Sequence, residues 1–154
     1  LPFVSFVGES SPCVERGIAT ECLPGATAFV PALVNSGFPC DRFCFEGFLP
    51  QKKGRQKKLS ALAEENRTMI FYESPFRLVK ALEQMAEVFG PTRHACVARE
   101  ISKMFEEFKR GTLEELAGWY KQNGVKGEIV LIVAGKDYNL AEEEGLHIEI
   151  EEEE

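Results

Sequence analysis

Apolar side chains recur along this chain at two spacings, one typical of helices and one typical of strands. Between residues 78 and 89 they fall at offsets of four, three and four, which predicts a helix with a single apolar stripe. Ser74 can cap free N–H groups, and Pro75 lacks an N–H that would need capping. We therefore expect this helix to run from Pro75 to the residue before Gly90, which favours a helix end.

A second helix is indicated by the sequence TLEE at residues 112–115. Thr112, with Glu115 three residues later, has the pattern of a capping box, in which each side chain bonds the backbone N–H of the other residue. The helix should end near Gly124. Its inward face should carry Leu113, Leu116, Ala117 and Tyr120.

Short runs of β-branched and aromatic residues predict the strands. They lie at residues 42–48, 68–73, 94–100 and 128–135, with a shorter, exposed strand at 105–111. Two further helices are expected, at about 27–36 and 56–65. Because helices and strands alternate, we expect an α/β fold. Its sheet should be mixed but largely parallel, with about five strands flanked by helices.

Charge is unevenly distributed, which changes the meaning of the formal net charge of −7. Residues 140–154 hold eight of the 25 acidic side chains and no basic ones, which leaves 17 acids against 18 bases in residues 1–139. The net charge therefore does not argue against a polyanionic partner. The acidic end is typical of a solvated tail, although the alternation over residues 146–150 would also suit a short edge strand.

The five cysteines are scattered, without a CxxC pair, and only two histidines accompany them. This pattern predicts neither a disulfide framework nor a zinc site, and free thiols are typical of a reducing cytosol. The sequence contains no run of eighteen apolar residues, which a membrane-spanning helix would need. Its first twelve residues lack the basic leader of a signal peptide. We expect a cytoplasmic protein that needs neither a membrane nor a metal.

Charged residues stand beside three predicted strands, where an α/β sheet collects its ligands. Glu73 closes the strand at 68–73, Arg99 and Glu100 close the next one, and Glu128 opens the last. Three such margins together indicate a polar site at one edge of the sheet. Glu73 also has a purely structural explanation, because a carboxylate there complements the helix dipole and pairs with Arg77.

Two other segments could bind an anion. Gly25 and Thr27 precede a predicted helix, so backbone N–H groups and a hydroxyl could face a ligand, although a simple helix cap would look the same. A cluster of basic residues would attract a phosphate backbone, unless it serves only to keep a loop soluble. The cluster consists of Lys52, Lys53, Arg55, Lys57 and Lys58.

Four segments, in order, carry a family resemblance: LPGATAFVPALVNSGFPCDRFCFEGFLPQKKG, RTMIFYESPFRL, VAREISKMFEEFKRGTLEEL and VKGEIVLIVAG. Together they resemble the ribosomal RNA small-subunit methyltransferase I family of the tetrapyrrole methylase-like superfamily, over about residues 17–135. The resemblance implies an S-adenosylmethionine-dependent enzyme that methylates a cytidine ribose 2′-hydroxyl in small-subunit ribosomal RNA. It also implies a homodimer of two-domain chains, with the methyl donor between the domains.

The first domain of such proteins, with its GTPG-type loop, has no counterpart in this sequence. The resemblance thus divides the chain into a remnant of the first domain with the interdomain helix (1–37), a carboxyl-terminal α/β domain (38–139) and an acidic tail (140–154). We expect this fragment to be inactive alone, because much of the donor site would lie in the missing half.

The resemblance also implies roles for single residues. Lys52, Lys53, Arg55 and Arg77 would meet RNA. Methyl transfer to a hydroxyl releases a proton, which Glu73, Glu100 or Lys103 could take, unless alignment of donor and acceptor does most of the work. The residues implied to lie near S-adenosylmethionine are Pro24, Gly25, Thr27, Ala28, Phe71, Tyr72, Glu73, Ala98, Arg99, Glu128 and Ile129.

Two alternatives stay open at this point. The domain could be a non-catalytic module for RNA docking and dimerisation, with the chemistry in the other half. It could also belong to a sister methyltransferase that acts on a tetrapyrrole or a protein, although the basic loop suits RNA better than a small substrate.

Overall fold

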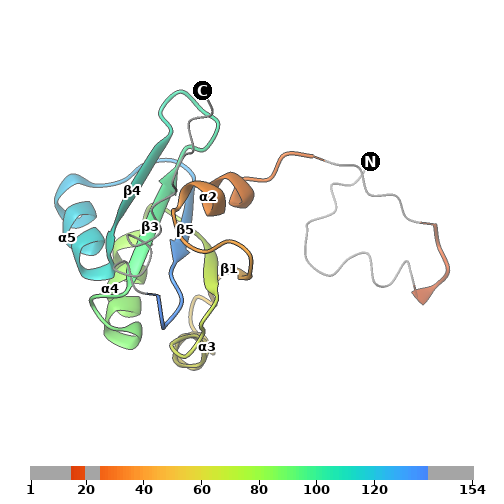
Figure 1. The fold of residues 1–154 in the computed structure, drawn as a ribbon, viewed down its shortest axis with the longest axis horizontal. Coiled ribbons are helices and arrows are strands. Elements are labelled where there is room, and N and C mark those ends of the chain that lie inside the picture. Colours follow the sequence, from red (N-terminus) through yellow and green to blue (C-terminus); the bar gives the residue numbers. More distant parts are fainter. Residues whose placement is uncertain (1–14, 20–24, 139–154) are drawn as a thin grey trace, which may run out of the picture.

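The computed structural model describes residues 15–19 and 25–138. Its strands are β1 (Phe43–Phe48), β2 (Thr68–Glu73), β3 (His94–Arg99), β4 (Glu107–Thr112) and β5 (Ile129–Val133). Its helices are α2 (Phe29–Asn35), α3 (Arg55–Leu62), α4 (Leu78–Phe89) and α5 (Leu113–Asn123). The strands form one sheet in the order β1-β2-β5-β3-β4 (Figure 1). Every predicted element is present, with ends within three residues of expectation.

The direction of the strands differs from expectation. The α/β class and the mixed five-stranded sheet are confirmed, but the sheet is not largely parallel: β1 and β2 pair in parallel, and the other three pairs are antiparallel. The strand that comes last, β5, inserts between β2 and β3 and runs against both. This insertion depends on contacts between residues far apart in the sequence, so local patterns do not reveal it.

The start of α4 also differs from expectation, because the helix begins at Leu78 rather than at Pro75. Ser74 caps a turn instead of the helix: its hydroxyl accepts a hydrogen bond from the Phe76 N–H (3.3 Å), and its carbonyl accepts one from the Arg77 N–H (3.0 Å). The turn leaves the Phe76 side chain 96% exposed.

The predicted capping box of α5 is confirmed. The Thr112 hydroxyl accepts a hydrogen bond from the Glu115 N–H (3.2 Å), and the Glu115 carboxylate accepts one from the Thr112 N–H (2.9 Å). The four predicted inward residues are all buried: Leu113, Leu116, Ala117 and Tyr120.

Two apolar clusters cover the two faces of the sheet. On one face, α3, α4 and α5 pack against side chains such as Phe71 and Leu131. On the other, α2 packs against Ile70, Val130 and Ile132. Figure 1 shows the short α2 on the opposite side of the sheet from α4 and α5. We call these the three-helix face and the α2 face.

None of the helices in the described ranges is long and apolar enough to cross a membrane. In the same ranges no three His, Cys, Asp or Glu side chains gather as metal ligands would. Cys40, Cys44 and Cys96 are free thiols. The predicted acidic tail at 140–154, with its alternative of an edge strand, lies outside the described residues.

Candidate functional site

The three strand ends that carry the predicted charged residues meet at one end of the sheet. Ile129 at the start of β5 pairs with Glu73 on one side and with Arg99 on the other. Beyond the paired strands, the Glu100 N–H donates to the Glu128 carbonyl (3.0 Å). We call this end, made of residues 72–73, 99–100 and 127–129, the Glu73 edge. The three segments thus lie side by side, as expected, although the Arg99 and Glu100 side chains do not line the hollow described next.

A hollow of about 450 Å³ opens at the Glu73 edge. This volume falls within the range of small-molecule sites. Its wall combines strand ends with the residue before α2 and the turn that precedes α4. The lining residues are Ala28, Phe48, Tyr72, Glu73, Ser74, Pro75, Gly127, Glu128, Ile129 and Val130.

The residues expected near a methyl donor divide between this hollow and other places. Gly25 and Thr27 precede α2 without lining the hollow, and Pro24 lies outside the described residues. The α2 N-cap is Ala28, whose side chain makes no capping bond. The expected donor residues that line the hollow are Ala28, Tyr72, Glu73, Glu128 and Ile129.

Three expected donor residues lie on the neighbouring strands but outside the hollow. Phe71 is buried on the three-helix face, and Ala98 is fully buried on the α2 face. Arg99 donates from Nε to the Glu107 carboxylate (3.0 Å) and from Nη1 to the Lys126 carbonyl (3.3 Å). Arg99 thus ties β3 to β4 and to the loop before β5.

An aromatic side chain that sequence reasoning missed, Phe48, forms part of the hollow. Its ring centroid lies 5.6 Å from that of Tyr72, whose centroid lies 5.4 Å from that of Phe45. The register of β1 shifts between Phe45 and Gly47, where Gly47 has φ of 60°. A bulge re-aims the residues after it, which places Phe48 beside Tyr72. Strict alternation along β1 gives no sign of this change.

Glu73 has the structural contacts that its alternative explanation requires. The side chain is 6% exposed, and Oε1 accepts a hydrogen bond from the Ser74 N–H (2.7 Å). Arg77 Nε lies 3.9 Å from the same oxygen. Because these contacts all use Oε1, Oε2 is the oxygen left for a group in the hollow.

Glu100 and Lys103 join Glu128 in a compact charged cluster. The Glu100 carboxylate accepts a hydrogen bond from the Glu128 N–H (2.7 Å), and this bond, aided by Lys103, lowers the pKa of Glu100. Lys103 Nζ lies 3.2 Å from the Glu128 carboxylate and 3.4 Å from that of Glu100. The hydrogen bond to Glu128 and the two carboxylate charges raise the pKa of Lys103. Both side chains therefore stay charged at neutral pH.

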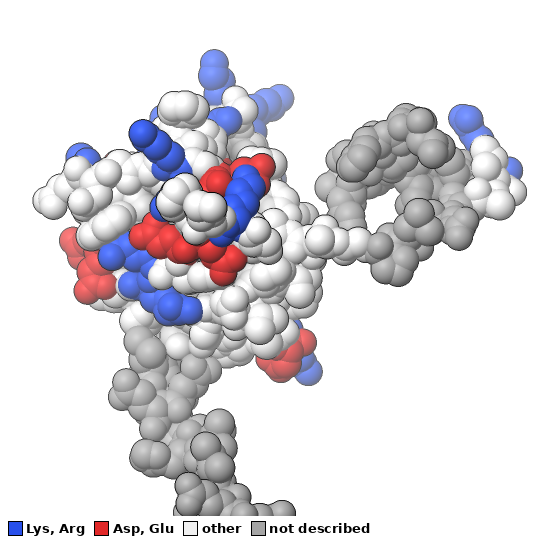
Figure 2. All heavy atoms as spheres, turned by 90° about the horizontal axis from the view of Figure 1, so that it is seen from above, with Lys and Arg blue, Asp and Glu red and all other residues white. Residues whose placement is uncertain are grey.

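The predicted RNA-binding residues have different surroundings. Lys52 and Lys53 are exposed, whereas Arg55 begins α3 and donates to Gln84 (2.7 Å) and to the Pro50 carbonyl (3.1 Å). Figure 2, which looks down on the top of Figure 1, shows acidic and basic side chains intermixed rather than one continuous basic patch. Arg55 thus stabilises the loop that displays Lys52 and Lys53.

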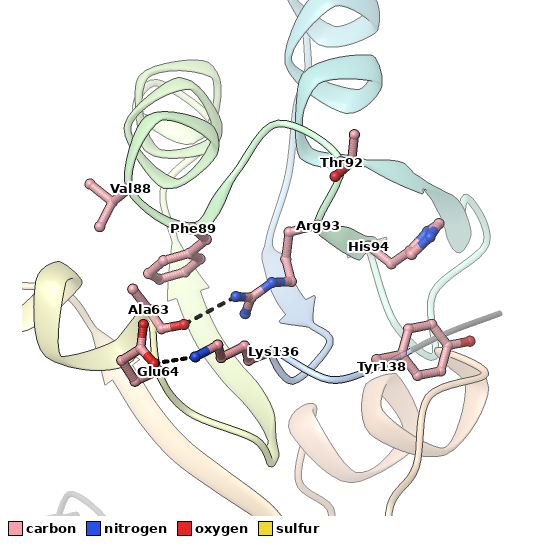
Figure 3. Close-up of a pocket in the computed structure, with 9 residues that line it drawn as sticks. All are labelled: Ala63, Glu64, Val88, Phe89, Thr92, Arg93, His94, Lys136 and Tyr138. Carbon is pink, nitrogen blue, oxygen red and sulfur yellow. Dashed lines mark hydrogen bonds and ion pairs between the residues drawn. The ribbon is translucent and has the colours of Figure 1, made fainter. Parts of the chain in front are cut away.

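A second pocket, of about 320 Å³, lies at the opposite end of the sheet and is drawn in Figure 3. Arg93 donates there to the carbonyls of Ala63 (3.1 Å) and Ala134 (3.3 Å), and burial lowers its pKa. Lys136 forms an ion pair with Glu64. We call this end, made of residues 63–67, 92–94 and 134–137, the Arg93 edge. The hollow at the Glu73 edge is larger, at about 450 Å³, and its wall includes aromatic and apolar side chains such as Phe48, Tyr72 and Ile129, so it is the better candidate site.

Comparison with known proteins identifies the family of this chain. The sequence profile of the tetrapyrrole (corrin/porphyrin) methylases matches residues 5–117. The chain belongs to the tetrapyrrole methylase family. Its sequence is 48% identical over 124 residues to the ribosomal RNA small subunit methyltransferase I of Mycobacterium tuberculosis, and 50% identical over 127 residues to that of Haemophilus influenzae.

Each of these alignments covers 80% of this chain but only 43% and 45% of the respective relative. The chain therefore spans less than half the length of the curated relatives it matches. The tetrapyrrole methylase relationship expected from sequence is confirmed.

Solved structures of two methyltransferases share the fold. A cobalt precorrin-4 methyltransferase of cobalamin biosynthesis has a TM-score of 0.60 at 17% identity, over 82% of this chain and 56% of that one. A uroporphyrin-III C-methyltransferase from Thermus thermophilus, complexed with S-adenosyl homocysteine, has a TM-score of 0.56 at 18% identity, over 84% of this chain and 58% of that one. At these identities the likeness concerns the fold alone.

Proposed function

We propose that this chain is the carboxyl-terminal part of an S-adenosylmethionine-dependent methyltransferase that modifies a cytidine ribose 2′-hydroxyl of small-subunit ribosomal RNA. The observation that carries the proposal is sequence identity of about 48% to proteins named ribosomal RNA small subunit methyltransferase I. We further propose that the whole protein is a cytoplasmic homodimer, with residues 1–37 belonging to the first domain and its connecting helix, 38–139 to the second domain and 140–154 to a tail.

The lining of the hollow fits one side of a methyl donor. When bound, S-adenosylmethionine supplies an electrophilic methyl group on a positively charged sulfur. Phe48 and Tyr72 offer aromatic faces, which attract a cation or stack on a purine. Ile129 and Val130 supply an apolar wall that excludes water. The remaining contacts would come from the part of the protein outside this chain.

Among the three candidates for removing the hydroxyl proton, Glu73 is the one whose position suits the task. It lines the hollow, is nearly buried and keeps Oε2 available. The Glu100 carboxylate already accepts a hydrogen bond from the Glu128 N–H, and the Lys103 ammonium lies between two carboxylates. We infer that Glu73 Oε2 accepts the proton, if the reaction uses a general base.

The RNA assignment is supported by the exposed lysines of the loop after β1. Lys52 and Lys53 follow Phe48 by only a few residues, so a phosphate backbone bound there would lie near the hollow. The exposed Phe76, in the turn that also lines the hollow, offers an apolar ring on which an unpaired base could stack. Arg77 follows it directly and remains 44% exposed despite its pairing with Glu73.

The donor proposal is tested in the full-length protein with a matched pair of phenylalanines at the two ends of β1. Phe48→Ala should weaken S-adenosylmethionine binding about tenfold, which is the loss of one aromatic contact, as measured by calorimetry. Phe43→Ala, which removes a ring that contacts Phe29 outside the hollow, should leave the affinity unchanged. Equal affinities in both variants would contradict the placement of the donor.

The RNA proposal has a separate readout. Changing Lys52 and Lys53 together to Ala should weaken binding to small-subunit ribosomal RNA and reduce the slope of log K against log salt by up to about 1.8 for duplex contacts. Lys121→Ala, on the exposed side of α5, is the control and should leave the slope unchanged. An unchanged slope in the double variant would argue against this loop. Methylation of a porphyrin precursor instead of RNA would favour the sister-enzyme alternative.

A further inference from the structure

Backbone strain is concentrated in one turn beside the hollow. Among the described residues other than glycine, positive φ occurs at Glu100 (52°) and Ser102 (62°) and nowhere else. Left-handed backbone is uncommon for a residue with a Cβ, and glycine or asparagine adopts it more readily. Such outliers persist where the surrounding contacts enforce them, and they gather at functional sites. Glu100 therefore occupies a position whose backbone favours a different residue.

The Glu100 side chain makes the contacts that could explain its presence. Its Oε1 accepts the Glu128 N–H at 2.7 Å, and its Oε2 lies 3.4 Å from Lys103 Nζ. The same ammonium lies 3.2 Å from the Glu128 carboxylate. The Glu100 N–H also donates to the Glu128 carbonyl (3.0 Å). Both the backbone and the side chain of Glu128 are thus held from the strained turn.

Gly127 completes the arrangement. It has φ of 89°, and a Cβ placed on it would clash with Glu100 Oε1. The carboxylate therefore occupies the space that a side chain at this position would need. Because Gly127 and Glu128 line the hollow, their backbone position determines the shape of its wall.

We propose that Glu100 is a positioning residue, whose carboxylate holds the Gly127–Glu128 segment in the shape that the methyl donor requires. The inference rests on the proposed function and adds a residue outside the hollow that controls its wall. In this role Glu100 neither contacts the donor nor takes the proton. Lys103 holds the two carboxylates together, and Gly127 must lack a side chain so that Glu100 can reach the Glu128 N–H.

The decisive variant is Glu100→Gly in the full-length protein. Glycine relieves the left-handed strain, so the melting temperature should stay the same or rise. The dissociation constant for S-adenosylmethionine should nevertheless rise about tenfold, with turnover at saturating donor changed less than about threefold, because only positioning is lost. Glu100→Gln, whose amide oxygen can still accept the Glu128 N–H, should recover most of the affinity.

Three outcomes overturn the proposal. An unchanged dissociation constant in Glu100→Gly would show that the carboxylate does not shape the wall. A lower melting temperature of Glu100→Gly, with no recovery of donor affinity in Glu100→Gln, would reduce Glu100 to a stabilising contact. If Glu100→Gln slowed turnover about 100-fold or more while donor affinity stayed intact, Glu100 would be the proton acceptor instead. If the unmodified protein did not bind the donor at all, the proposed function itself would fail.

A double-variant cycle tests the contact between the two residues. Gly127→Ala should raise the dissociation constant for the donor, and the increase should be several-fold smaller when Glu100 is also Gly, because the clash with the carboxylate is then removed. Gly90→Ala is the matched control: φ there is 103°, and a Cβ would meet nothing within 4 Å. It should leave donor affinity unchanged. Equal effects of Gly127→Ala in both backgrounds would refute the coupling.

Discussion

The two ends of the sheet differ in the surface that surrounds their polar residues. At the Arg93 edge, guanidinium and ammonium groups bond carbonyls and carboxylates of the chain itself, as Figure 3 shows for Arg93 and Lys136. At the Glu73 edge the charged groups also bond the chain, but the hollow beside them is lined mainly by aromatic and apolar residues, the backbone is strained at Glu100, and the ring of Phe76 is exposed. The first arrangement connects segments of the fold, whereas the second leaves surface for a ligand.

A polar edge of the sheet is therefore not by itself a ligand site. Both ends have a pocket, cations and carboxylates within hydrogen-bonding distance. They differ in the apolar and aromatic lining of the hollow at the Glu73 edge and in the left-handed backbone at Glu100 beside it. Substitutions at the Arg93 edge should therefore lower stability and spare donor affinity, and three predictions put this contrast to the test.

The largest effect should come from Gly135→Ala. A Cβ at this buried glycine would clash with the Asn66 carbonyl oxygen, which is backbone and cannot move aside as the Glu100 carboxylate can. Overpacking of this kind should lower the free energy of unfolding by about 3 kcal/mol, as measured by urea denaturation of the full-length protein. Gly118→Ala is the control, since its Cβ would meet nothing within 4 Å on an exposed part of α5, and it should raise stability slightly.

Arg93→Ala should have the next largest effect. The change leaves the carbonyls of Ala63 and Ala134 without their donor and removes a guanidinium that lies over the Phe89 ring (5.5 Å). We expect the free energy of unfolding to fall by about 2 kcal/mol. Arg42→Ala, at an exposed arginine near the same end, should cost less than about 0.5 kcal/mol. A clear loss of donor affinity in folded Arg93→Ala would break the contrast between the two edges.

The smallest effect concerns Glu65, whose carboxylate accepts two hydrogen bonds from the Arg67 guanidinium (2.9 and 3.0 Å). These bonds lower the pKa of Glu65 to about 2. A carboxylate whose pKa is lowered by folding stabilises the protein above its unfolded pKa, about 4.3, and loses this contribution as the pH falls toward 2.

Glu65→Gln should therefore cost about 1 kcal/mol at pH 7 and progressively less below about pH 4. Urea denaturation at several pH values measures this dependence. Glu87→Gln, on the exposed surface of α4, provides the control, and its cost should be near zero at every pH. The prediction fails if Glu65→Gln costs as much in strong acid as it does at neutral pH.

Much of the fold could be predicted from the sequence because its signals are local. The capping box at Thr112 and Glu115 and the apolar stripe of α4 depend on neighbouring residues, and both are present in the structure. The sequence also predicts that the charged strand ends lie close together, because strand ends gather at the edges of any such sheet. The turn at Ser74 differs from expectation, because a serine followed by proline can cap either a helix or a tight turn.

The rest of the candidate site could not be predicted, because it depends on contacts between segments distant in sequence. Phe48 lines the hollow because a bulge shifts the register of β1 against β2. Arg99 donates a hydrogen bond to Glu107 on β4 instead of lining the hollow. Glu100, whose backbone is strained, contacts Glu128, which lies 28 residues away. No local pattern distinguishes these residues from ordinary strand ends.

The place of β5 in the middle of the sheet has a consequence for synthesis on the ribosome. Of the described strands it is translated last, yet it alone joins the pair β1-β2 to the pair β3-β4. Until Val133 has left the exit tunnel, the edges of β2 and β3 that pair with β5 lack their hydrogen-bond partner. Exposed strand edges of this kind can pair with other chains. The nascent polypeptide thus passes through a vulnerable interval that ends only when its closing segment emerges.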